Sequence, residues 1–248
     1  VKIDGTTQIG YVSQPLISII NGGGRDYGLR LWGGNGSTVK GLNIQGFSTS
    51  GIDISGSNNN VISGNYIGTN ITGTASAGNA LGINIWGGQN NIIGGTSAAD
   101  RNVISGNTNL GIFMGGGAHG NQILGNYIGL NAAGIAAIAN TNNGIHIADS
   151  YNIVIGNGTA GGRNVISGNG GHGIYVDNGD NASIRGNYIG TNAAGSSTVA
   201  NAGDGIQLAD GTSGATIGGT AAGAGNTIGG NAEAGIAIDG AATSGDTV

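Results

Sequence analysis

The residues best suited to acid–base chemistry in this sequence recur at a spacing of about thirty positions. His146 and Tyr175 occupy the third position of two copies of a short Gly-Ile-x-Ile/Val motif, and Asp177 follows the second copy. A histidine beside a carboxylate can accept and return a proton near neutral pH. His146, Asp177 and Tyr175 are therefore the candidates for catalysis. A solvated surface that happens to gather polar residues is the alternative interpretation.

Aromatic and polar residues fill most of the third and fifth positions of the other copies of the motif. If equivalent positions lie side by side, these residues form one outer face. Such a face suits sugar rings, which stack on aromatic side chains and hydrogen-bond to polar groups. The alternative is that the aromatic residues shield a sheet or pack under a neighbouring segment. The predicted ligand-binding residues are Arg30, Trp32, Asn84, Trp86, Phe113, His146, Tyr175 and Asp177.

The motif itself predicts the elements that position these residues. It begins eight times with glycine, and intervals of about 30 residues separate most copies; these glycines are Gly28, Gly51, Gly82, Gly111, Gly144, Gly173, Gly205 and Gly235. Each unit holds three short apolar pieces separated by Gly, Asn and Ser, for example 51–54, 61–64 and 66–69, which indicates strands and turns. We expect the isoleucines of the motif to point inward and the glycines to lie outward, leaving room for a ligand.

Three short strands per repeat predict an all-β parallel β-helix. Each coil has about 30 residues, and the sequence contains at least eight coils. We expect a single domain over residues 1–248, either complete or a segment of a longer array. A right-handed coil follows the general preference of parallel crossovers.

Composition and charge exclude several classes of protein. Glycine accounts for 57 of 248 residues, which argues against a helical domain, and no cysteine is present to form a disulfide. The net charge is −5 with seven basic residues, so nucleic acid is not an expected partner. No apolar run is long enough to span a membrane.

Asparagine recurs at predicted turns, with a longer period than the motif. The phrase that begins at Asn65 returns at Asn126 and Asn187, at a spacing of 61 residues each time. Asparagine tolerates turn conformations, and its amide can hydrogen-bond along a stack. Two ladders of stacked side chains are therefore predicted, one with Asn65, Asn126 and Asn187 and one with Asn107, Asn169 and Asn231.

Neither a metal site nor a cofactor is predicted. His119 and His172 lie in expected turns without matching partners, and no cluster has zinc-ligand spacing. A calcium site is the alternative, because several carboxylates recur near strand ends. Arg101 and Arg163 occupy equivalent turns; either they clamp an anion or each bonds carbonyl groups of its own loop. The carboxylates considered for calcium are Asp177, Asp180, Asp204, Asp210 and Asp239.

The phrases Asn-Val-Ile-Ser-Gly-Asn (102–107), Asn-Tyr-Ile-Gly-Thr-Asn (65–70) and Gly-Ile-x-Ile resemble the right-handed parallel β-helix repeat proteins of the pectate-lyase-like superfamily. More closely, they are similar to repeat arrays of large secreted or surface-attached bacterial proteins. The resemblance covers almost the whole chain. It implies the fold and a secreted or cell-surface location in a bacterium. Some members cleave or epimerise acidic polysaccharides, and others bind glycans, adhere or space domains. No lyase motif matches residue by residue.

The expected function is therefore that of an extracellular structural, adhesive or glycan-binding module without catalysis. Its expected partner is a polysaccharide or cell-surface glycan. One alternative is a polysaccharide lyase, hydrolase or epimerase that uses the face around His146. A further alternative is a filament protein that self-associates through its coil ends, where unpaired strand edges invite pairing.

Overall fold

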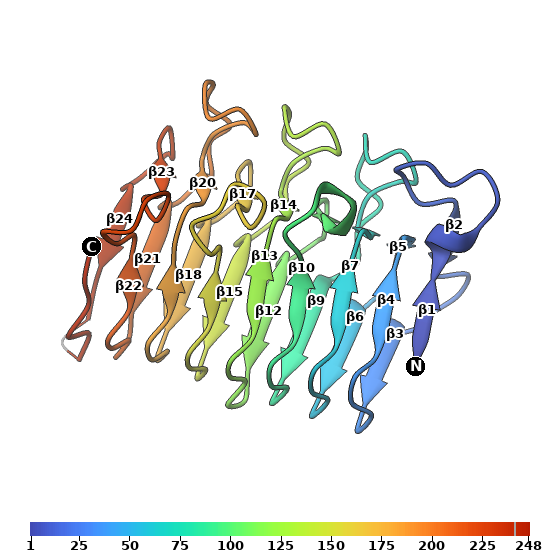
Figure 1. The fold of residues 1–248 in the computed structure, drawn as a ribbon, viewed down its shortest axis with the longest axis horizontal. Coiled ribbons are helices and arrows are strands. Elements are labelled where there is room, and N and C mark those ends of the chain that lie inside the picture. The colour runs from blue at the N-terminus through green and yellow to red at the C-terminus, as the bar shows by residue number, and fades with distance from the viewer. Residues whose placement is uncertain (241) are drawn as a thin grey trace.

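The computed structural model describes residues 1–240 and 242–248, which form a right-handed parallel β-helix. Three parallel sheets of eight strands run along the rod, and the chain passes from sheet A to sheet B to sheet C in each coil (Figure 1). Sheet A contains β1 (Lys2–Asp4), β4 (Thr38–Lys40), β7 (Val61–Ser63), β10 (Ile92–Gly94), β13 (Gln122–Leu124), β16 (Val154–Ile155), β19 (Ser183–Ile184) and β22 (Thr216–Ile217).

The other two sheets follow the same order along the rod. Sheet B contains β2 (Ile17–Ile20), β5 (Leu42–Gln45), β8 (Tyr66–Ile67), β11 (Val103–Ile104), β14 (Tyr127–Ile128), β17 (Val165–Ile166), β20 (Tyr188–Ile189) and β23 (Thr227–Ile228). Sheet C contains β3 (Tyr27–Trp32), β6 (Ser50–Ser55), β9 (Leu81–Trp86), β12 (Ile112–Gly115), β15 (Ile145–Ala148), β18 (Ile174–Asp177), β21 (Ile206–Ala209) and β24 (Ile236–Ile238). The only helical turns in the described residues are η1 (Gly5–Thr7) and η2 (Ala98–Asp100). The predicted coils of three strands are thus confirmed.

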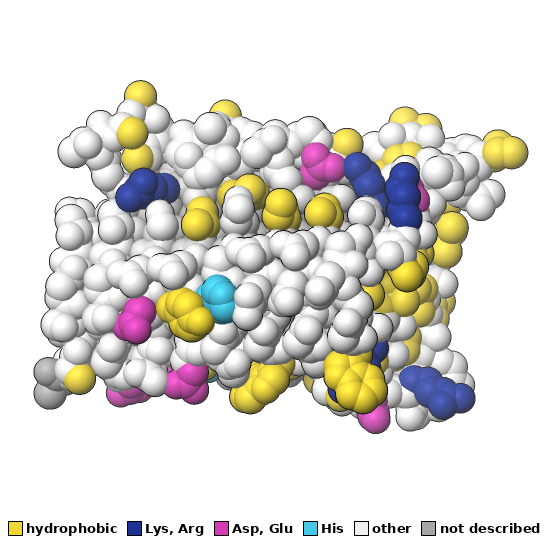
Figure 2. All heavy atoms as spheres, turned by 60° about the horizontal axis from the view of Figure 1, so that its bottom comes forward, with side chains coloured by type: hydrophobic (Ala, Val, Ile, Leu, Met, Phe, Trp, Pro, Cys, Tyr) yellow, Lys and Arg dark blue, Asp and Glu magenta, His cyan; other side chains and the backbone are white. Residues whose placement is uncertain are grey.

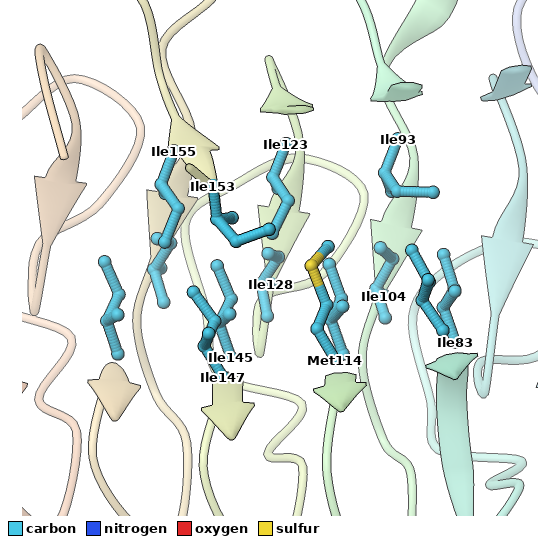
Figure 3. Close-up of a cluster of buried hydrophobic side chains, with 14 of the residues drawn as sticks. Ile83, Ile93, Ile104, Met114, Ile123, Ile128, Ile145, Ile147, Ile153 and Ile155 are labelled. Carbon is cyan, nitrogen blue, oxygen red and sulfur yellow. The ribbon is translucent and has the colours of Figure 1, made fainter. Parts of the chain in front are cut away.

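The motif isoleucines form the core, as the sequence predicts. Ile112 pairs with Ile83 on one side and with Ile145 on the other, and all three side chains are fully buried. Figure 3 shows such side chains from the three sheets filling the space between the strands. Burial of each contributes roughly 1.5–3 kcal/mol. No described residue belongs to a helix with the length and apolarity needed to cross a bilayer.

Buried asparagine ladders line the corners of the coil. Within a ladder, the amide accepts a hydrogen bond from the asparagine one coil earlier and donates to the one that follows, as in Asn102–Asn126–Asn164. The ladder between sheets A and B contains Asn65, Asn102, Asn126, Asn164, Asn187 and Asn226. The ladder between sheets B and C contains Asn79, Asn107, Asn140, Asn169, Asn201 and Asn231.

The predicted ladders are confirmed, and they contain further asparagines between the predicted ones. Asn65, Asn126 and Asn187 do not stack on one another, because Asn102 and Asn164 lie between them. The asparagine phrases repeat every two coils because the long loop lies at one corner in one coil and at another corner in the next. Residues 68–80, 129–144 and 190–205 connect sheet B to sheet C, whereas 95–102, 156–164 and 218–226 connect sheet A to sheet B.

Most of the motif glycines are buried inside the coil, so their predicted outward placement was wrong. Gly111 is buried, and a Cβ atom there would lie 2.5 Å from the carbonyl oxygen of Gly144 and 3.0 Å from Cγ2 of Ile128. Its equivalents Gly82 and Gly173 make the same kind of contact with core isoleucines. The chain turns inward at these positions, where it enters sheet C beside the asparagine ladder. The glycines therefore leave no room for a ligand on the outer face.

Candidate functional site

Strand register brings the predicted ligand-binding residues to the outer face of sheet C. Every pair is a direct parallel neighbour, so the side chains follow one another from coil to coil. One column contains Arg30, Asp53, Asn84, Phe113, His146, Tyr175 and Gln207. The adjacent column contains Trp32, Ser55, Trp86 and Gly115, and further along Ala148, Asp177 and Ala209. The predicted placement is confirmed, whereas ligand binding stays a prediction.

Ring side chains in the middle of this face touch one another in sequence. The ring centroids of Trp86 and Phe113 are 6.4 Å apart at an interplanar angle of 22°, and those of Phe113 and His146 are 5.3 Å apart. His146 continues the row to Tyr175 at 4.8 Å. Trp86 remains 55% exposed. Phe113 and His146 meet edge to face at 78°, and His146 and Tyr175 are tilted by 43°, so the rings form a continuous but uneven row in which Trp86 is the most exposed.

Two glycines allow Trp86 to lie over the strand of the next coil. A Cβ atom at Gly116 would lie 2.5 Å from Cε2 of the indole, and one at Gly115 would lie 3.1 Å from its Cζ3. Only residues without side chains leave this space. Sequence reasoning missed the role of these glycines, although the run Gly115–Gly117 interrupts the repeat and could have indicated it.

A buried carboxylate anchors the polar residues at the N-terminal end of the face. Oδ2 of Asp53 accepts a hydrogen bond from Nε of Arg30 at 3.0 Å, and Oδ1 accepts one from Nδ2 of Asn84 at 2.7 Å. Asp53 is only 2% exposed, whereas the Arg30 side chain is 45% exposed, so a buried carboxylate holds a guanidinium that remains open to solvent. The Arg30 guanidinium also lies 5.4 Å from the ring centroid of Trp32, which is 77% exposed. These contacts fix two polar groups beside an exposed ring.

The structure brings the three catalytic candidates together. Nε2 of His146 lies 3.3 Å from Oδ2 of Asp177, but the two atoms do not have the geometry of a hydrogen bond. The Tyr175 hydroxyl points away from this pair toward Asp210 and donates a hydrogen bond to its Oδ2 at 3.4 Å. The histidine and the carboxylate are thus adjacent without the alignment that proton transfer requires.

Burial first, and then the charges of Asp177 and Asp210, raise the pKa of Tyr175 above its ordinary value. The unfolded chain loses this proton first, so the folded state loses stability as pH rises through the ordinary tyrosine pKa toward the raised one. We expect Asp210→Asn to lower the pKa of Tyr175, because it removes a negative charge. NMR titration of the tyrosine ring carbons would measure the shift, and an unchanged pKa would contradict the assignment.

His172 has partners that the sequence analysis did not foresee. It lies with Asp204 and Glu233, and one potential ligand atom from each residue falls within 4.8 Å of the others. Nδ1 of His172 accepts a hydrogen bond from the backbone N–H of Asp204 at 3.0 Å. An imidazole nitrogen has one lone pair, so Nδ1 is already occupied and we assign no metal to this cluster.

The remaining titratable side chains are dispersed. His119 stacks on Tyr151 at 4.6 Å in the turn after sheet C and contacts no carboxylate among the ion pairs of the described residues. The carboxylates considered for calcium contact different groups: Asp180 accepts from Ser213, and Asp239 accepts from Gln207. In the described part of the chain they do not converge on one point.

Solved structures share this fold, although the sequence matches no protein-family model and no curated protein. The periplasmic alginate epimerase AlgG is 18% identical, with a TM-score of 0.61 over 89% of this chain and 46% of its own. PfbA, a surface adhesin of Streptococcus pneumoniae, is 15% identical, with a TM-score of 0.47 over 97% of this chain and 70% of its own. The chain thus spans about half the length of AlgG. At these identities the likeness shows the fold alone.

Proposed function

We propose that this chain is a non-catalytic, secreted or cell-surface module that binds a neutral glycan along the outer face of sheet C. The observation that carries the proposal is the continuous row of ring side chains from Trp86 to Tyr175. Successive coils lie about 4.8 Å apart, which is close to the length of one sugar residue. An extended glycan would therefore meet a ring or a fixed polar group at nearly every residue.

The charge of this face favours a neutral ligand. Asp177 and Asp210 flank Tyr175, and Asp149 ends the segment that carries His146. Arg30, in the first coil, is the only lysine or arginine in the strands of sheet C. A uronate or sulfate bound near His146 would meet negative charge without a compensating cation. A location outside the cytoplasm is compatible with this fold, because AlgG, which shares it, is a periplasmic protein.

A polysaccharide-active enzyme is the second candidate, and the approach of His146 to Asp177 supports it. Such an enzyme would use the histidine as a base or acid beside Tyr175. An enzyme that acts on uronates also needs a cation to neutralise the substrate carboxylate. The acidic residues around His146 argue against an enzyme that acts on uronates. If the chain is an enzyme, we therefore expect it to hydrolyse a neutral glycan.

Trp86→Ala is the variant that tests glycan binding. We expect the affinity for a neutral glycan identified on a glycan array to fall at least about tenfold, because the largest exposed ring of the row is lost. Isothermal titration calorimetry would measure the change. Ile135→Ala, which removes an exposed apolar side chain from a loop of another corner, is the matched control and should bind normally.

The same samples distinguish binding from catalysis. Binding predicts that no shorter sugar appears after prolonged incubation. Product formation that His146→Ala abolishes would establish the enzyme instead. If Trp86→Ala and the unaltered chain bound the glycan with equal affinity, the proposed binding site would be wrong.

A further inference from the structure

Long loops border both edges of the outer face of sheet B, and we call this loop-bordered strip, which the function proposed above does not use, the sheet B groove. Its floor is a row of outward side chains on β8, β11, β14, β17 and β20. The loops 95–102 and 156–164 border one edge, and the loops 68–80, 129–144 and 190–205 border the other. A hollow of about 250 Å³ lies between these walls at the N-terminal end of the groove. It is lined by Ser13, Tyr66, Ala98, Arg101, Val103 and Ala132.

Two arginines are fixed along this groove in the same way. The guanidinium of Arg101 lies 4.2 Å from the ring centroid of Tyr127, and its Nε donates to the carbonyl of Gly125 at 3.2 Å. Arg163 repeats the arrangement over Tyr188, at 4.1 Å, and donates to Gly186 at 3.1 Å. The carbonyl in each case belongs to the next coil, so the predicted bond within the same loop was wrong.

The terminal nitrogens of both guanidinium groups are available to a ligand. Among the described residues, Arg101 and Arg163 donate side-chain hydrogen bonds only through Nε. Stacking on a tyrosine and one carbonyl bond hold each group in place, so little further ordering is needed when an anion binds. The planar fork that remains matches a carboxylate or a sulfate.

Basic residues gather at this corner of a chain that is acidic elsewhere. From the second coil onward, the corner between sheets A and B carries Lys40, Arg101, Arg163 and Arg185, against a single acid, Asp100, which pairs with Lys40 at 2.9 Å. Figure 2 shows most of the basic side chains visible in that view along the upper side of the rod and most of the acidic ones along the lower side. The groove is therefore a local positive strip on a protein of net charge −5.

We propose that this groove binds an acidic polysaccharide that presents one anionic group on the same side at every second sugar residue. Arg101 and Arg163 lie two coils apart, roughly 10 Å, which is about the length of two linked sugar rings. Each guanidinium then meets one carboxylate or sulfate of consecutive disaccharides. Glycine, alanine, serine and threonine dominate the bordering loops, which therefore offer hydroxyl and backbone groups beside short side chains.

Single-stranded nucleic acid fits the groove less well. Its recognition relies on open aromatic faces for the bases and on many phosphate contacts. Here the ring of Tyr127 is 91% buried between Arg101 and the loop that contains Gly134. The four basic residues are also few for a polymer with a phosphate at every nucleotide.

Hyaluronan hexasaccharide tests the proposal, because it carries one carboxylate per disaccharide, and chitohexaose is the neutral comparison. We expect the unaltered chain to bind hyaluronan hexasaccharide at least about tenfold more tightly at low salt than in 0.5 M NaCl, where charges more than a few ångströms apart are screened. Arg101→Gln/Arg163→Gln should weaken binding at least tenfold. Arg25→Gln, which removes an exposed arginine elsewhere, should leave affinity unchanged.

A second variant keeps the test valid if the double mutant does not fold. Ala98→Glu places a carboxylate on an exposed position of the groove wall without disturbing either stack, and it should also weaken hyaluronan binding severalfold. Trp86→Ala should not affect hyaluronan, which separates this groove from the face of sheet C. The proposal is overturned if both groove variants bind normally, if chitohexaose binds equally well, or if an oligodeoxythymidine of equal charge binds more tightly.

Discussion

Asn126→Ala is expected to lower the free energy of unfolding by about 3 kcal/mol or more. Oδ1 of Asn126 accepts hydrogen bonds from the backbone N–H and the Nδ2 of Asn102, and its Nδ2 donates to Asn164 and to the carbonyl of Ile93. All of these groups lie in a fully buried corner. Alanine leaves them without partners, and each buried unsatisfied group costs about 1–3 kcal/mol.

Denaturant unfolding followed by far-UV circular dichroism would measure this loss. Asn142→Ala is the matched control, because Asn142 is exposed and makes one long side-chain contact of 3.5 Å to Asn109. We expect the control to unfold within about 0.5 kcal/mol of the unaltered chain. Similar midpoints for the two variants would show that the ladder contributes no more than surface asparagines do.

The sequence allowed the sheets and the core to be predicted because each strand alternates between inward and outward side chains. Once Ile112, Ile145 and Ile174 were taken as one inward column, Phe113, His146 and Tyr175 had to share the outer face, and the register confirms this. This prediction needs only the two-residue period of a strand. It therefore holds wherever the chain is a regular strand.

The corners of the coil could not be predicted in the same way. Asn102 and Asn65 share one ladder, yet they follow segments of different lengths, so counting residues does not reveal that they stack. The contact of His172 with Asp204 also forms at a corner, where the chain leaves a loop and enters sheet C. Loop conformation decides both arrangements, and the repeat of the motif contains no information about it.

The candidate sites also differ in how far strand register alone predicts them. The row of ring side chains on sheet C follows from strand register. In contrast, three-dimensional packing decides that Asp53 is buried and that Trp86 lies over Gly115 and Gly116. The arginine stacks on sheet B depend on a side chain that reaches from one coil to the next. Their recurrence at Arg101 and Arg163 was visible in the sequence, but their aromatic partners were not.

Gly111→Ala is the substitution for which we expect the largest effect. The added methyl group would lie 2.5 Å from the carbonyl oxygen of Gly144, 2.9 Å from Nδ2 of Asn140 and 3.0 Å from Cγ2 of Ile128. The first contact is with backbone, and the others are with the ladder and the core, so no flexible side chain can move aside. Overpacking typically costs about 1–3 kcal/mol, and we expect the upper end or more at this site.

Position in the rod increases the consequence of this clash. Each coil of a solenoid is stabilised by its two neighbours, and β12 lies in the fourth of eight coils. A coil forced apart there separates the stack into two halves, each with a newly exposed end. We therefore expect Gly111→Ala to unfold at lower denaturant and in a broader transition, measured by circular dichroism and by proteolysis between the halves.

Gly225→Ala provides the control, because a Cβ atom there would meet no atom within 4 Å. Its stability should stay within about 0.5 kcal/mol of the unaltered chain. If Gly111→Ala matched this control, a side chain at the first motif position would have to lie outside the coil. That result would restore the outward glycine column expected from the sequence, and with it a channel along the face of sheet C.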